Sequence, residues 1–371
     1  MLSFAAAHLD YLHPGHPHYH RAKYALLNKA LHDYRETLSA PITADNCDAL
    51  LGTANLIQFL MWCDLSFMEG QQPLETSASG LDLSGDRLYF LSTGVRQIFF
   101  MAWPLFQSAR SVFQRVGLLQ PCMALEDVVE ARGLRWRRHV RGFMELYDNP
   151  RYRGGRNGLA AFSSFSSSFS SSPSSCASSS ERSRSPPGSF PAASPGRSTG
   201  AYLEGVWDSL PSSRAPTHNV MTLWQSYKEG EAYVRSAGVH DEGLMRAAFK
   251  RLVARLAVAM AFVMDQEGSG CPAFGTWGDR YRQPELKRSD MVRYVATFPM
   301  MCFGPLLALI SSGDSRMLVV LFHIYRVAGV LLPGETYWWC RRRVEVMEDA
   351  IGRELRRRGL EVCLRGQNEV V

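Results

Sequence analysis

Apolar residues recur along this chain mostly at helical spacing. Between residues 18 and 39, Tyr24, Leu27, Leu31 and Tyr34 form one stripe, with charged side chains mostly outside it. No long stretch alternates apolar and polar residues with the two-residue period of a strand. The pattern therefore predicts an all-α protein.

The same periodicity predicts about ten helices in all. After a helix that starts near Cys47, capped by Thr43 or Asp45, residues 86–117 form a long apolar segment with an expected kink at Pro104. Further helices are predicted over residues 124–132, 134–147, 241–265, 286–310, 314–331 and 335–358, with a Gly- and Pro-rich loop over residues 268–284. The fold class that follows is a multi-helix bundle or array.

A serine-rich tract interrupts this helical pattern. Residues 161–200 hold 18 serines in 40 positions, and such a composition buries too little apolar surface to offset the entropy of ordering. We predict a disordered Ser/Pro/Arg-rich insertion over residues 151–216. It separates an N-terminal half, residues 1–150, from a C-terminal half, residues 217–371, of one helical domain.

Cysteine usage and hydropathy indicate an intracellular protein. The chain has 8 cysteines, and none forms the C-x-x-C pair that a zinc module needs, so we expect them to be reduced and mostly buried. The start of the chain lacks the basic segment of a signal peptide. The longest uncharged apolar run, residues 298–310, is too short and too rich in Pro and Gly to span a membrane.

Charge alone does not indicate nucleic-acid binding, since the net charge is only +6. Arginines are dense between Arg132 and Arg156, where nuclear import or partner contact is an open alternative to a solvated surface. Arginines also recur in the last helix, but Glu345, Glu348, Asp349 and Glu354 alternate with them. That alternation predicts a self-paired, solvated helix face.

Signatures of catalysis are missing from the sequence. It contains no G-x-S-x-G, Walker A, G-x-G-x-x-G or H-E-x-x-H motif and no adjacent aspartates. The segment His13–His20 is rich in histidine, but its Pro and Gly residues favour a turn between helices over a metal site. We therefore expect neither an enzyme nor a bound cofactor.

Aromatic and methionine side chains could line a cavity for an apolar ligand. The alternative is ordinary core packing, which aromatic residues dominate in any case. The candidate ligand-binding residues are Phe59, Trp103, Phe106, Phe298, Met301, Phe303 and Trp338.

Several segments together resemble a known family. They are AAAHLDYLHP, YRETLSAPITADNCDALLGTANLIQFLMW, LSTGVRQIF, FPMMCF, LVVLFHIYRVAGVL around His323, and YWWCRRRVEVMEDAIGREL. In order and content they are similar to the regulatory, effector-binding region of fungal zinc-cluster transcription factors, in particular the group that includes the sterol uptake control protein. The resemblance covers most of residues 1–147 and 217–360.

This resemblance implies a function as well as a fold. It implies a ligand-responsive regulatory domain in the nucleus, or shuttling to it from the cytoplasm, that binds a sterol-like apolar molecule. It also implies a homodimer or contact with the transcription machinery. The family's six-cysteine zinc cluster is absent from this sequence, so we expect no direct nucleic-acid binding by this chain. The alternative is a helical interaction or dimerisation scaffold without a small-molecule ligand.

Overall fold

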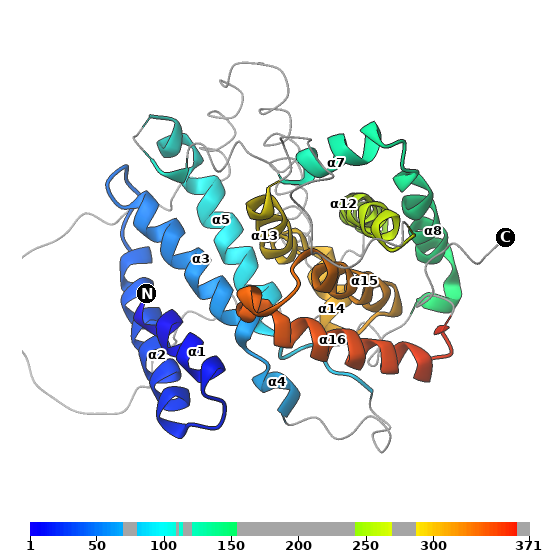
Figure 1. Cartoon of the computed structure of the whole chain (residues 1–371). Helices are drawn as coiled ribbons and strands as arrows, with labels where there is room; N and C mark the ends of the chain where they lie inside the picture. Colours follow the sequence, from blue (N-terminus) through cyan, green and yellow to red (C-terminus); the bar gives the residue numbers. More distant parts are fainter. Residues whose placement is uncertain (70–79, 109–110, 114–120, 154–241, 269–286, 362–371) are drawn as a thin grey trace, which may run out of the picture.

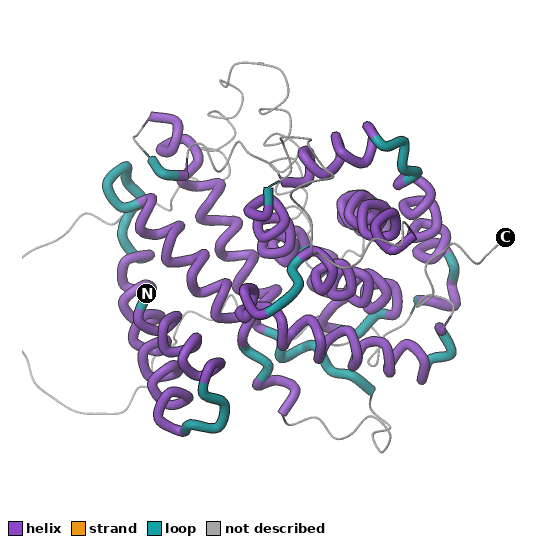
Figure 2. Tube along the Cα trace, viewed as in Figure 1, coloured by secondary structure: helices purple, strands orange, loops and turns teal. Residues whose placement is uncertain are grey.

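The computed structural model describes residues 1–69, 80–108, 111–113, 121–153, 242–268 and 287–361. Every regular element in these ranges is an α-helix or a short 3-10 helix, and no strand occurs in them (Figure 2). The prediction of an all-α fold is confirmed.

The N-terminal helices lie together on one side of the molecule (Figure 1). A turn over residues 13–16 joins the first two, which pack against each other, and α3 packs along α5. The predicted turn at the histidine-rich segment is therefore present. These elements are α1 (Leu2–Leu12), α2 (Pro17–Leu38), α3 (Cys47–Cys63), α4 (Ser66–Glu69) and α5 (Arg87–Ser108).

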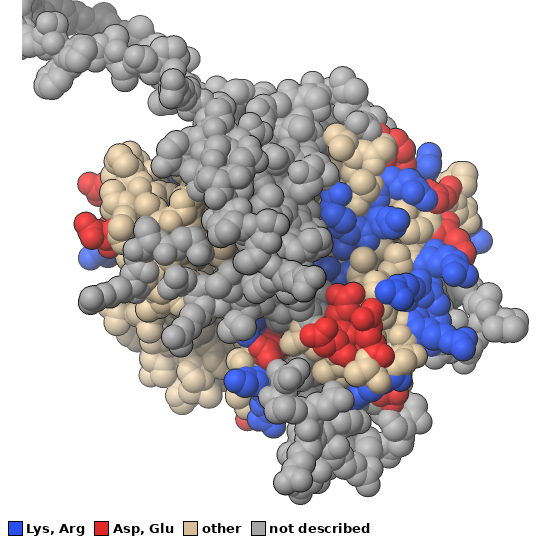
Figure 3. Space-filling view, turned by 90° about the horizontal axis from the view of Figure 1, so that it is seen from above, with Lys and Arg blue, Asp and Glu red and all other residues tan. Residues whose placement is uncertain are grey.

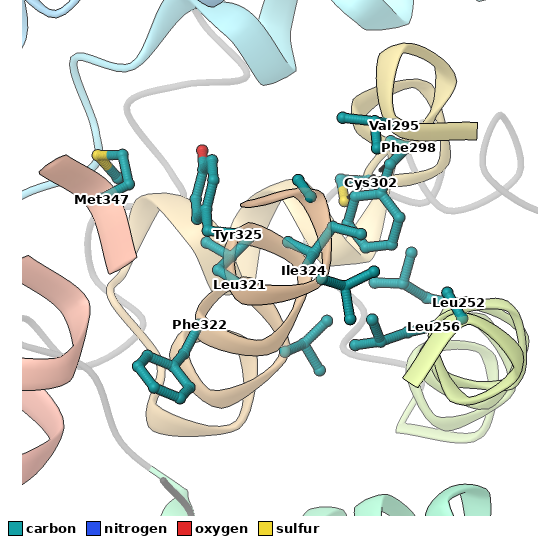
Figure 4. Packing of buried hydrophobic residues seen from close by; sticks show 14 of the residues in the cluster. Leu252, Leu256, Val295, Phe298, Cys302, Leu321, Phe322, Ile324, Tyr325 and Met347 are labelled. Carbon is teal, nitrogen blue, oxygen red and sulfur yellow. Dashed lines mark hydrogen bonds between the residues drawn. The ribbon is translucent and has the colours of Figure 1, made fainter. Parts of the chain in front are cut away.

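The other helices surround α15 (Ser315–Leu331), which is buried along almost its whole length. Figure 4 shows Leu321, Phe322, Ile324 and Tyr325 of α15 among side chains from neighbouring helices. Those surrounding elements are α7 (Pro121–Ala131), α8 (Trp136–Asp148), η1 (Pro150–Tyr152), α12 (Glu242–Gly268), α13 (Arg288–Thr297), η3 (Phe298–Met301), α14 (Pro305–Ser311), η4 (Glu335–Tyr337) and α16 (Trp338–Arg357).

Two clusters of buried apolar side chains form the core. The larger one joins residues from α3, α5, α7 and α8 with residues from α12 to α16, so it contains chain from both sides of residues 154–241. The smaller one lies between α3 and α5. The ends of the intervening segment also meet, because Arg153 and Glu242 form an ion pair of 3.4 Å. Of the predicted insertion over residues 151–216, residues 151–153 are described, and Arg151 and Tyr152 belong to η1. The rest of the insertion, the helical pattern over 217–241 and most of the loop over 268–284 lie outside the described residues.

Two local predictions were wrong. The helix cap before α3 is Asn46 rather than Thr43 or Asp45, and the Asn46 side chain accepts a hydrogen bond from the Thr43 amide instead of capping the helix. The single helix predicted over residues 286–310 is broken into α13, η3 and α14. By contrast, α5 continues through Pro104.

Candidate functional site

The seven candidate residues lie in three separate places. Phe59 and Trp338 lie where α1 covers α3 and α16, and the Trp338 ring stacks on His8 with 4.6 Å between ring centroids. Trp103 and Phe106 are buried in the smaller core cluster. Phe298, Met301 and Phe303 lie together around η3. Four of the seven are buried, whereas Phe59, Met301 and Trp338 are half-buried against the core, and only three of the seven share one segment.

That segment is a break between α13 and α14, which meet at an angle of 88°. Pro305 begins α14 and Pro299 is the second residue of η3, positions that the fixed backbone angle of proline favours. Between them, Gly304 has φ 58° and ψ −125°, a conformation that residues with a side chain rarely adopt. The sequence thus encodes the break with three residues of restricted or unusual backbone.

The break contacts both core clusters. Phe298 and Cys302 are buried in the larger cluster, and Met300 packs against the smaller one. On the side facing α12, the Met301 sulfur lies 2.9 Å from Nη1 of Arg255, and the Tyr294 hydroxyl donates to the Arg255 carbonyl at 3.0 Å. A movement of this segment would change the packing of both clusters.

On the side that faces α5, Arg96 contacts two residues of the break. The guanidinium is 3% exposed, donates to the Met300 carbonyl at 3.3 Å and lies 3.2 Å from the centroid of the Phe303 ring. Stacking of this kind is a cation–π interaction, which strengthens when water is excluded. Sequence reasoning missed Arg96, although an arginine inside the apolar segment 86–117 is a signal, because arginine is rarely buried without partners.

Gln58 of α3 supplies a second polar link to the same segment. Its buried side-chain amide donates to the Ala296 carbonyl at 2.9 Å and to the Ser92 hydroxyl at 3.0 Å. The last turn of α13 is therefore tied to α3 and α5 by hydrogen bonds within the apolar interior. Such buried bonds fix one arrangement of the helices, because leaving their groups unsatisfied is costly.

A buried ion pair joins α16 to the residue that precedes α5, and its arginine also binds the end of α3. Nη1 of Arg343 lies 2.7 Å from Oδ2 of Asp86, and both residues are almost fully buried. The guanidinium also donates to the carbonyls of Trp62, Met61 and Asp64. Burial lowers the pKa of Arg343, but the Asp86 carboxylate outweighs this effect and raises it overall. The fully satisfied arginine is a structural group with no proton to exchange.

Burial holds two thiols and one imidazole of the interior in their neutral forms. Burial raises the pKa of the Cys63 and Cys340 thiols to about 12, which keeps both protonated. Burial, with a smaller effect of Arg138, lowers the pKa of His139 to about 4. Among the described residues no group of three or more His, Cys, Asp or Glu is arranged to hold a metal ion.

One helical stretch within the described part, Cys47–Glu69, is long and apolar enough to cross a membrane. Leu50, Leu60 and Trp62 in it are buried against other helices, and a core helix has the same composition. The bent pair Arg288–Met301 and Pro305–Ser311 passes the same test only when its two parts are counted together.

Comparisons with models of protein families, with curated proteins and with solved structures found no match. The resemblance to fungal zinc-cluster regulators therefore stays a prediction from the sequence.

Proposed function

We propose that this chain is a regulatory domain of a fungal zinc-cluster-type transcription regulator that responds to an apolar, sterol-like molecule. In this proposal the domain acts in the nucleus, or shuttles to it, and changes arrangement without making or breaking covalent bonds. The sequence resemblance motivates the proposal. The observation that carries it is the break between α13 and α14, because this segment contacts both core clusters.

The mechanism is a shift between two arrangements of the break. A ligand moves such an equilibrium only as far as it binds one arrangement better than the other. Phe303 stacked on Arg96 defines one arrangement. An apolar molecule that packed against the stacked Phe303 ring would favour this arrangement, and its loss would free η3 and change the packing of α13 and α14 at once.

The first test is the lipid content of the purified protein. Organic extraction followed by mass spectrometry should recover a sterol or another apolar molecule in stoichiometric amount. A protein that is empty after expression in a fungal host, and that takes up no added sterol, contradicts the proposal.

The second test places the response at the break. Titration with the fluorescent sterol dehydroergosterol should show weaker binding to Phe303→Leu than to wild type, because the ring stacked on Arg96 is lost. The matched control is Phe249→Leu, a buried phenylalanine that contacts Tyr147 between α8 and α12. Equal affinities of the two folded variants, checked by circular dichroism, contradict this placement.

A second candidate function, a dimerising scaffold, is favoured by the outward face of α1. Leu2, Leu9 and Leu12 are 72%, 39% and 53% exposed, whereas Ser3, Ala6 and Ala7 of the same helix are buried. With exposed Ala5, these leucines follow the three-and-four spacing of a helix–helix seam.

The occupant that we propose for this face is a second copy of the chain. Two polar side chains of α1 are engaged elsewhere, since Asp10 pairs with Lys23 at 2.6 Å and His8 stacks on Trp338. An uncharged face does not repel its own copy across a twofold axis. Three leucines supply only part of the ~800 Å² per partner of a standard interface, so we expect weak association.

Light scattering during size-exclusion chromatography tests this candidate. Wild type should dimerise as concentration rises, and the variant Leu2→Ser/Leu9→Ser/Leu12→Ser should stay monomeric. The control Leu38→Ser/Val112→Ser removes exposed apolar side chains outside α1 and should still dimerise. A monomeric wild type, or a dimeric triple variant, rules out this role for α1. Binding of monomeric wild type to phosphatidylcholine vesicles would assign the face to lipid instead.

A further inference from the structure

The beginning of α8 carries a dense group of arginines on the surface. Arg135, Arg137, Arg138 and Arg141 are all exposed and fall within seven positions. We call these four residues the α8 arginine cluster.

These positive charges lie at the positive end of the helix dipole, where they are unfavourable. Arg135 is the N-cap and makes no capping hydrogen bond, Arg137 and Arg138 follow in the first turn, and that turn contains no acidic residue. The N-terminus of a helix is the positive end of its dipole, where cations are unfavourable and anions are favourable. The arrangement therefore costs helix stability and favours an anion at the same place.

Of Arg135, Arg137 and Arg141, only Arg137 has a carboxylate partner among the described residues. Arg137 contacts Glu130 at 3.3 Å through two exposed side chains, a geometry that contributes little. In the part of the chain that the structure describes, no carboxylate lies within ion-pair distance of Arg135 or Arg141. On α16, by contrast, Arg341 pairs with Glu345 and Arg353 with Asp349.

The helix that carries the cluster is packed firmly against the rest of the protein. The opposite face of α8, which includes Phe143, Met144 and Tyr147, is buried, and this helix packs along α12. Half-buried Trp136 lies between the arginines, with the Arg137 guanidinium 4.9 Å from its ring centroid. Arginine and tryptophan on a rigid support are the residue types that dominate the binding energy of protein interfaces.

The dimensions of the cluster favour a short partner. Arg135 and Arg141 are six residues apart, which is about 9 Å along a helix. Exposed Glu130 precedes the cluster, and exposed Glu145 follows it. Figure 3, seen from the side where α7 lies, shows basic and acidic side chains next to one another. A nucleic-acid duplex presents a longer field of negative charge, which these flanking carboxylates would repel.

We propose that the α8 arginine cluster is a docking surface for a short acidic segment of a partner protein, two or three carboxylates long. The carboxylates pair with the arginines, and an apolar residue of the partner packs on Trp136. This surface goes beyond the ligand response proposed above and does not depend on it.

Fluorescence anisotropy with a fluorescein-labelled hexaglutamate peptide tests this surface on the full chain. Wild type should bind at physiological ionic strength and release the peptide as salt rises. The variant Arg135→Asp/Arg141→Glu should bind about tenfold more weakly or worse, as expected when charge pairs become repulsive. Its melting temperature should not fall, because aspartate is a favoured N-cap residue.

Two further comparisons decide the result. Arg135→Lys/Arg141→Lys should retain most of the binding. Arg342→Glu/Arg356→Glu, the same number of charge reversals at exposed positions of α16, should bind like wild type. Equal losses in both charge-reversed variants would mean unspecific attraction and overturn the proposal. Tighter binding of a labelled DNA duplex than of the peptide, or no binding of the peptide by wild type, would overturn it as well.

Discussion

His139 is a residue whose ionisation the fold opposes. It is 1% exposed, neither ring nitrogen has a hydrogen-bond partner among the described residues, and its pKa is lowered to about 4. The unfolded chain binds a proton near pH 6.5, whereas the folded chain does so only near pH 4. The stabilising contribution of neutral His139 to the free energy of unfolding is therefore complete above about pH 6.5 and is lost as pH falls toward 4.

We expect this single group to reduce the free energy of unfolding by about 2 kcal/mol between pH 7 and pH 5. Urea unfolding at the two pH values measures the loss. His139→Phe, which fills the site with a ring that cannot ionise, should remove about that much of the pH dependence. An unchanged difference between the two pH values in this variant would show that other groups cause it.

Sequence patterns predicted the environment of some arginines and not of others. Arg341 pairs with Glu345 on the helix surface, as the alternating charges indicated. Arg343, two positions later, is buried against Asp86. Consecutive helical residues point in different directions, and the partner of Arg343 lies 257 positions away in the sequence. No local pattern contains that information.

At the scale of elements, the break after α13 depends on the backbone of Gly304. With φ at 58° and ψ at −125°, a side chain at this position would be strained. We expect Gly304→Ala to lower the free energy of unfolding by about 1–3 kcal/mol. Thermal unfolding followed by circular dichroism measures the effect.

Gly94 provides a control of opposite sign. It lies inside α5, is exposed, and an added Cβ there would meet nothing within 4 Å. Gly94→Ala should therefore stabilise the protein by about 0.5–1 kcal/mol, because alanine loses less backbone entropy in a helix. If both variants changed stability equally, the break would not depend on a glycine at position 304.

The long helices were predictable because each repeats its apolar face over many turns. The predicted residues 18–39 became α2, and residues 314–331 became α15. The break between α13 and α14 was less predictable, since apolar residues recur at helical spacing on both sides of it. Pro299, Gly304 and Pro305 were the only local sign, and the tertiary contacts of Arg96 and Gln58 determine where the chain turns.

At the scale of the whole molecule, the apolar runs of the sequence predicted which aromatic side chains pack in or against the core. They could not predict which of the two core clusters each side chain joins. Trp103 and Phe298 are both aromatic residues within apolar runs of the sequence, but they belong to different core clusters. Which cluster a side chain joins depends on helices that meet only in the folded chain. The candidate site was therefore predictable as a set of residue types and not as a place.

The strongest prediction at this scale concerns residues 161–200. These residues lie within the segment 154–241. Arg153 and Glu242, at the two ends of that segment, form an ion pair, and the larger core cluster joins helices that precede it with helices that follow it. The fold on either side is thus closed without this tract. Its removal roughly halves the connecting chain, which changes loop-closure entropy in the stabilising direction by only about 0.5 kcal/mol.

We expect a chain that lacks residues 161–200 to keep its helical circular dichroism and its cooperative melting transition, with a melting temperature equal to or slightly above that of the full chain. The matched comparison is an excision that continues through residue 246. It removes Glu242, the partner of Arg153, and Arg246, which pairs with Asp148 at 2.7 Å. That longer excision also shortens α12 where it packs on α8, so its melting temperature should fall. Loss of the transition after the shorter excision would place the serine-rich tract within the core rather than outside it.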